Sequence, residues 1–241
     1  MKKMMLLVVC LYASLQVAGA EDTPALRLIT EENMPINYRD RETGEITGAA
    51  HDMVMALMEK AGVPYTVELL PWQRGYRLAL ESENSCIYGI NRTHDREELF
   101  SWVGPLMQSS WAFYSYDQSL ELDDLTSIRD QMVVAKAGDA ISIALRAARP
   151  DISLITVETD VMAVRLLAHG RAQLWLTGIV NAPRNAEEAG VDLPDRKLLW
   201  RKSVIYMGCS KKTDPKVIER LKAAMPLLED QRAQVLKRYW D

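Results

Sequence analysis

The sequence predicts an α/β protein made of two similar lobes. Two observations carry this prediction. Short apolar strands alternate with amphipathic helices, and this series runs once in each half of the chain. The alternation implies that each lobe holds a mainly parallel sheet flanked by helices. A chain of 241 residues is long enough for two lobes of roughly 100 residues each.

The chain begins with the pattern of a cleavable export signal. Lys2 and Lys3 precede an apolar run from Met4 to Leu11, and 18–20 reads Ala-Gly-Ala, a small-residue cleavage site. The apolar run is too short to span a bilayer. We therefore expect residues 1–20 to be a signal peptide and the mature protein to begin at Glu21.

The first half alternates strand, helix, strand, helix and strand. Strands are expected at 26–30, 65–70 and 85–90, and helices at 50–61 and 72–80. The apolar residues of the first helix recur at helical spacing, and Gly62 ends it. Pro71 opens the second helix.

The second half repeats this order without a detectable sequence repeat. Strands are expected at 110–116, 132–136, 152–157 and 174–177, and helices at 120–125 (short), 140–148 and 159–169. Thr159 and Asp160 are expected to cap the last of these helices, and Gly170 to end it. A final strand at 203–210 and helices from Asp214 and from about Leu228 complete the chain. The absence of a linker-like segment indicates that strands, acting as a hinge, connect the lobes.

Composition excludes several classes of function. The formal net charge is −4, and removal of Lys2 and Lys3 makes the mature chain more negative still, which argues against nucleic-acid binding. The three histidines are scattered and not at ligand spacing, so we expect no metal site and no cofactor. Cys86 and Cys209 remain open between a disulfide and two buried thiols.

The segment 91–105, NRTHDREELFSWVGP, is the strongest functional signal. It follows a short apolar strand and places Arg92 and Arg96 on a polar turn near the start of a short acidic helix. An arginine fork bonds a carboxylate with two parallel contacts, and a helix N-terminus favours the same charge. The segment predicts capture of a small carboxylated molecule.

The chain resembles the family 3 extracellular solute-binding proteins of bacteria, which serve ABC importers of polar amino acids and similar solutes. The resemblance covers essentially the whole mature chain and rests on five segments. They are Met34-Pro35-Ile36-Asn37-Tyr38, Thr47-Gly48, Pro71-Trp72-Gln73-Arg74, Arg92-Thr93-His94-Asp95-Arg96-Glu97 with Phe100-Ser101-Trp102-Val103-Gly104-Pro105, and 167–172 (LAHGRA).

The resemblance implies the type II periplasmic binding protein fold. Lobe one would comprise 21–108 and 206–241, lobe two 109–205, with hinge strands near Trp111 and Tyr206. A ligand would lie in the cleft at the carboxyl ends of the strands and be enclosed as the lobes close. The protein would be a periplasmic monomer without catalytic activity that delivers its ligand to an inner-membrane ABC permease.

The resemblance also implies which residues bind the ligand. Arg96 would grip the carboxylate, helped by Asn91, by the backbone of Thr93 and by the turn Gly138-Asp139-Ala140. Many amino-acid binders carry an aspartate just after the strand that corresponds to 174–177, and here the chain has Gly178 instead. This departure argues against an ordinary α-amino acid as ligand.

Four further residues are candidates for the cleft. Tyr38 and Trp72 would form aromatic walls, and Arg92 and Arg74 could supply more positive charge.

Several of these residues have a structural interpretation as well. Arg96 could lie at the surface, Thr93 could cap its helix through the hydroxyl, and Trp72 could anchor helix to sheet. Asp139 is expected to cap a helix, although it is also the best remaining partner for a cation.

Two other functions fit the same scaffold. Cyclohexadienyl dehydratases are similar to these binding proteins, and an enzyme of that kind would need a general acid or base, for which His94, Asp139 and Glu158 are the candidates. A loaded receptor could instead dock on a membrane sensor rather than on a permease.

Overall fold

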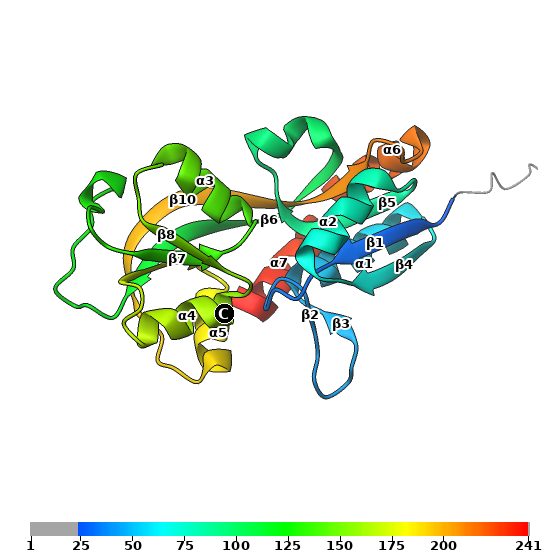
Figure 1. Cartoon of the computed structure of the whole chain (residues 1–241). Helices are drawn as coiled ribbons and strands as arrows, with labels where there is room; N and C mark the ends of the chain where they lie inside the picture. The colour runs from blue at the N-terminus through cyan, green and yellow to red at the C-terminus, as the bar shows by residue number, and fades with distance from the viewer. Residues whose placement is uncertain (1–23, 241) are drawn as a thin grey trace, which may run out of the picture.

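The structure, a computed structural model, describes residues 24–240, so the expected signal peptide lies outside the described residues. Two α/β lobes lie side by side and are joined by two long strands, β6 (Phe100–Ser115) and β10 (Asp195–Ser210), which run through both (Figure 1). Within residues 24–240, no helix has the length and apolar character needed to cross a bilayer.

The strands of each lobe are mainly parallel, which confirms the expected fold class. They are β1 (Leu26–Thr30), β4 (Tyr65–Leu69) and β5 (Ser85–Asn91) in lobe one, and β7 (Val133–Lys136), β8 (Leu154–Val157) and β9 (Leu174–Gly178) in lobe two. The sheet order is β4-β1-β5-β10-β6-β9-β7-β8. β1 is parallel to β4 and β5, and β7 is parallel to β8 and β9. The long strands are antiparallel to each other and to their neighbours, so they couple the two parallel sheets.

Helices cover both faces of each sheet. Those of lobe one are α1 (Ala49–Ala61), α2 (Trp72–Glu81), α6 (Pro215–Ala224) and α7 (Glu229–Trp240), and those of lobe two are α3 (Ala140–Ala148), α4 (Asp160–Ala168) and α5 (Ala182–Ala189). The remaining elements are the 3₁₀ turns η1 (His94–Leu99), η2 (Leu125–Ser127) and η3 (Met225–Leu228), and the hairpin of β2 (Tyr38–Arg39) and β3 (Ile46–Thr47). In β1, Leu28 faces the core under α1 and Ile29 the core under α2, as the alternation of a strand requires.

One local expectation was wrong, two expected strands are longer than predicted, and one helix was not predicted. The segment 120–124 is not helical, and the helical turn is η2 instead, because the side chains of Asp117 and Asp124 accept hydrogen bonds from backbone N–H groups two residues on. The expected strands 110–116 and 203–210 are parts of the longer β6 and β10. Helix α5 carries the signals Pro183 at its start and Gly190 at its end.

The two cysteines form a disulfide, which decides an alternative that the sequence leaves open. Cys86 in β5 and Cys209 in β10 are paired across neighbouring antiparallel strands. Both are completely buried in the core of lobe one. The bond therefore ties the carboxyl-terminal strand of lobe one to the first part of the chain.

Candidate functional site

A small polar cavity lies where the two lobes meet. It encloses about 30 Å³, which is space on the scale of about two water molecules. The residues that line it are Asn33, Ile36, Gly89, Asn91, Ser109, Trp111, Asp139, Ile141, Asp160, Thr177, Gly178, Asn181, Ser203 and Ile205. Most of them carry a hydrogen-bonding side chain. A solute of amino-acid size can enter only if the lobes move apart.

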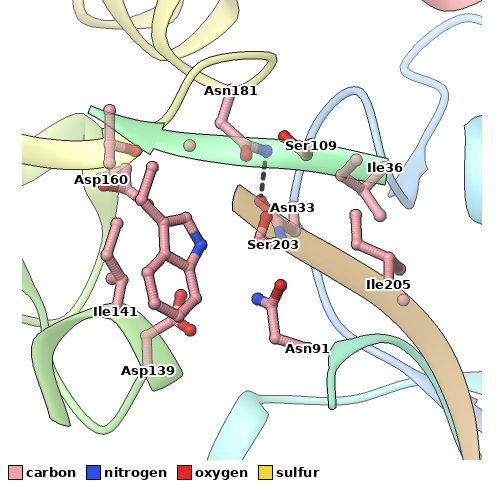
Figure 2. Close-up of a pocket in the computed structure, with 14 residues that line it drawn as sticks. Asn33, Ile36, Asn91, Ser109, Asp139, Ile141, Asp160, Asn181, Ser203 and Ile205 are labelled. Carbon is pink, nitrogen blue, oxygen red and sulfur yellow. Dashed lines mark hydrogen bonds between the residues drawn. The ribbon is translucent and has the colours of Figure 1, made fainter. Parts of the chain in front are cut away.

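The cavity is assembled from segments that are far apart in the sequence. Asn33 follows β1 and Asn91 ends β5 in lobe one, and Asp139 and Asp160 start α3 and α4 in lobe two. The long strands β6 and β10 pass between them (Figure 2). These positions are the carboxyl ends of the parallel strands, where open α/β sheets place their ligands.

Two carboxylates supply the charge of the cavity. Asp160 accepts a hydrogen bond from Trp175 Nε1 (3.1 Å), and burial, with a further contribution from nearby Asp139, raises the pKa of its carboxyl group. Asp139 occupies the N-cap position of α3, but its side chain makes no capping bond. The expectation that this side chain caps the helix is therefore wrong, and the carboxylate lines the cavity instead.

Two ion pairs cross between the lobes. Lys136 Nζ, at the end of β7, lies 2.5 Å from Glu31 Oε2, just after β1, and both side chains are nearly buried. Burial opposes the charge on Lys136, but Glu31 and Asp139 outweigh it and raise the pKa of the ammonium group. At the surface, Arg41 pairs with Glu188 at 2.6 Å.

Hydrogen bonds also join the lobes directly. Asn181 Nδ2 donates to Asn33 Oδ1 (2.8 Å) and to the carbonyl oxygen of Met34 (3.0 Å). Trp72 Nε1 donates to the carbonyl oxygen of Gly138 (3.1 Å). The lobes are therefore closed on one another, and the cavity is what remains between them.

Arg96 is buried beside the cavity but does not line it. Its side chain is covered by α2, with the guanidinium 5.1 Å from the ring centre of Trp72 and 5.3 Å from that of Tyr76. Arg96 Nη1 donates to the carbonyl oxygen of Asn91 (3.4 Å), and only 3% of the residue is exposed. Asn91 does line the cavity, and its buried Oδ1 has no hydrogen-bond partner among residues 24–240. The structure thus brings Arg96, Asn91 and Trp72 together.

Arg92 lies on the outer side of the same turn. Its Nε donates to Glu97 Oε2 (2.8 Å), and its guanidinium lies over the rings of Trp102 and Tyr206. Two of its five N–H donors, on Nε and Nη2, are therefore used by Glu97, away from the cavity.

The remaining predicted residues fall into two groups. Gly138 and the buried Ala140 lie at the start of α3, next to Asp139. Tyr38 is half-buried in β2 and Arg74 is exposed on α2, and neither lines the cavity. Thr93 does not cap η1, because its hydroxyl makes no capping bond and is buried without a partner.

Sequence reasoning missed most of the lining residues, and three of them, Asp160, Asn33 and Asn181, carry polar side chains that follow parallel strands. Asp160 was interpreted as part of a cap, but Thr159 provides the cap alone by accepting from Met162 N (3.1 Å), which leaves the carboxylate of Asp160 for the cavity. Asn33 follows β1 and Asn181 follows β9. A polar residue directly after each parallel strand is the signal that could have found all three.

Comparison with known proteins identifies the fold but not a family. No protein-family model matches the chain, and no curated protein matches it either. A histidine kinase sensor domain with similarity to periplasmic binding proteins superposes with a TM-score of 0.79 at 16% identity, covering 90% of this chain and 96% of the other.

Two binding proteins superpose with slightly lower TM-scores. A mutant of ArgBP from T. maritima has a TM-score of 0.76 at 14% identity, with 90% and 95% of the two chains covered. The substrate-binding protein of an ABC uptake transporter from Streptococcus pneumoniae, with bound histidine, has a TM-score of 0.75 at 16% identity, with 89% and 92% covered. At these identities the likeness concerns the fold alone: the chain has the two-lobed architecture of periplasmic binding proteins.

Proposed function

We propose that this protein is a periplasmic solute-binding protein that encloses a small polar solute between its lobes and delivers it to an ABC-type importer. The observation that carries the proposal is the cavity between the lobes, to which both lobes contribute hydrogen-bonding side chains. Such a site binds only when both lobes contact the solute, so binding and closure are coupled. The protein acts as a monomer and as a receptor, not as an enzyme.

Arg96 is the proposed anchor for a carboxylate of the solute. It is held in place by Trp72 and Tyr76 and adjoins the cavity through Asn91. Opening of the lobes breaks the bond between Trp72 and Gly138 and uncovers this part of the cleft. A guanidinium already held by aromatic rings loses little freedom when it binds a carboxylate.

A thermal-shift screen against amino acids, dicarboxylates, amines and peptidoglycan fragments tests the proposal. A solute at 100 times its dissociation constant stabilises the folded protein by roughly 2.7 kcal/mol, which is readily measured as a rise in melting temperature. If no member of the screen raises it, the binding role is contradicted.

Replacing the anchor gives a sharper test. Arg96→Ala is expected to weaken binding of the solute found in the screen by about 2–5 kcal/mol, because the solute carboxylate is left buried without its partner. Isothermal calorimetry measures this loss, and Arg96→Lys, which keeps the charge but not the fork, is expected to recover part of it. Arg77→Ala, on the exposed side of α2, is the control. An unchanged affinity in Arg96→Ala contradicts the assignment.

A sensory role is the second candidate, and the similarity to a histidine kinase sensor domain favours it. In that role the loaded protein docks on a membrane-bound kinase. A permease and ATPase encoded beside the gene support import, whereas an adjacent sensor kinase supports signalling.

A further inference from the structure

The cavity has an excess of negative charge. Asp139 and Asp160 line it, and none of the lining residues is basic. The nearest lysine, Lys136, is already paired with Glu31 at 2.5 Å. Lys136 also attracts Asp139 and Asp160. It is, however, one cation shared with Glu31 among three carboxylates, so the site keeps an excess of negative charge.

The local hydrogen bonds do not make up for this charge. The carboxylate of Asp139 makes no hydrogen bond or ion pair with any residue in the range 24–240. Asp160 accepts hydrogen bonds from the indole N–H of Trp175 and from the side chain of Thr177, but both donors are neutral. Burying a carboxylate without a counter-charge is unfavourable unless a cation or a proton joins it.

The two helix N-termini at the cavity already have an anion each. The start of a helix attracts negative charge, so α3 and α4 would by themselves favour an anionic solute. Here Asp139 begins the one and Asp160 the other. The part of the cavity formed by lobe two therefore repels a carboxylate instead of binding it.

Lobe one offers an acceptor on the opposite side. Asn91 Oδ1 is buried, lines the same cavity and accepts no hydrogen bond from the part of the chain that the structure describes. Figure 2 shows the amide of Asn91 pointing into the space that Asp139 and Asp160 border from lobe two. Two carboxylates and an amide oxygen, contributed by both lobes, suit the several N–H donors of an ammonium group.

We propose that this cavity is a subsite for a cationic group, and that the solute presents an ammonium or similar organic cation to Asp139, Asp160 and Asn91. The inference rests on the proposed function and specifies its solute class. Arg96 bonds the backbone of Asn91 from the other side. A solute with both charges would therefore span Asn91, with its cation in the cavity and its carboxylate at Arg96.

The test uses three probes of equal chain length: butylamine, which carries only a cation, butyrate, which carries only a carboxylate, and 4-aminobutyrate, which carries both. Melting temperature and calorimetric affinity are measured for the wild type, Asp139→Asn and Asp160→Asn. Glu158→Gln, an exposed acid in the same loop as Asp160, is the matched control.

The expected result has two parts. Without solute, Asp160→Asn melts a few degrees higher than the wild type, because a buried charge that Lys136 balances only in part is removed while the acceptor for Trp175 remains. With probes, butylamine and 4-aminobutyrate bind the wild type, each Asp→Asn change weakens them at least tenfold, and Glu158→Gln does not.

Any of four outcomes overturns the inference. Butyrate binding as tightly as the amines, or amines binding equally to the Asp→Asn variants, removes the cation subsite and leaves the proposed function intact. A melting temperature that Asp160→Asn does not raise contradicts the charge argument without reference to any probe. The absence of a shift with all three probes removes the cation subsite, whereas the binding role itself falls only if the wider thermal-shift screen also gives no shift.

Discussion

The raised pKa of Asp160 indicates that its carboxyl group belongs to a functional site. A carboxylate at this helix start would normally be favoured, yet burial and the neighbouring Asp139 raise its pKa. The folded, solute-free protein therefore disfavours the charged form of a group that the unfolded chain ionises freely. A buried carboxylate whose charged form is disfavoured in this way is typical of a ligand-binding site.

The raised pKa of Asp160 predicts how the stability of the folded protein depends on pH. The pKa of Asp160 is raised in the folded state above its unfolded value of about 3.9. The charged carboxylate therefore destabilises the folded protein fully at a pH above the folded pKa. This destabilisation is lost as the pH falls through the folded pKa towards the unfolded value, because the group becomes protonated. Asp160→Asn should therefore melt higher than the wild type at neutral pH, and the two should converge near about pH 4. Melting curves over this range measure the difference, and a difference that does not vary with pH contradicts the prediction.

The two arginines of the segment 91–105 acquire different surroundings. Arg96 is covered by Trp72 and Tyr76 of α2, whereas Arg92 lies over Trp102 and Tyr206 at the outer side. The segment containing Trp72 and the segment containing Arg96 are thus in physical contact. Periodicity predicted the strand and the turn, but not which arginine would face the cleft.

Among the elements, the loop from β1 to α1 depends most on one residue. Gly48 is the N-cap of α1 with φ 124°, and a Cβ there would lie 2.5 Å from the carbonyl oxygen of Ile36. Ile36 lines the cavity, so the start of α1 and the cavity wall touch at a point that only glycine can occupy.

Gly48→Ala is therefore expected to destabilise the fold by about 2 kcal/mol or more, since the backbone must move to relieve the contact. Gly44→Ala is the matched control, because Gly44 also has a positive φ but has no atom within 4 Å of the added Cβ. Its expected cost is only about 1 kcal/mol. Urea unfolding of the two variants measures the difference, and equal losses would show that the contact with Ile36 is not important.

At the scale of the whole molecule, direct contacts hold the two lobes against one another. The contacts between Glu31 and Lys136, between Asn181 and Asn33, and between Trp72 and Gly138 all cross the cleft. Because closure takes both charges of the ion pair out of water, removing one partner leaves the other buried and uncompensated. Closure should then become unfavourable.

Lys136→Met is accordingly expected to open the solute-free protein, which increases its radius of gyration in small-angle X-ray scattering. Arg27→Met is the control, because Arg27 pairs with Glu68 inside lobe one at a similar distance of 2.6 Å and does not touch lobe two. Identical scattering from Lys136→Met and the wild type would show that the pair does not hold the lobes together.

The sequence by itself determined the local elements and the fold class. Helix α1 and its end at Gly62, the cap at Thr159, and strands β1, β5 and β9 follow from periodicity and capping rules that act within a few residues. Their alternation is enough to imply parallel sheets with helices on both faces.

Only the tertiary structure decided which residues meet. The disulfide depends on β10 lying next to β5, and the cavity depends on Asn33, Asn91 and Asp160 arriving from separate strand ends. Asp139 could be interpreted as a cap until its side chain was placed. The physical reason is that burial and charge balance are properties of the assembled cleft, and no local pattern specifies them.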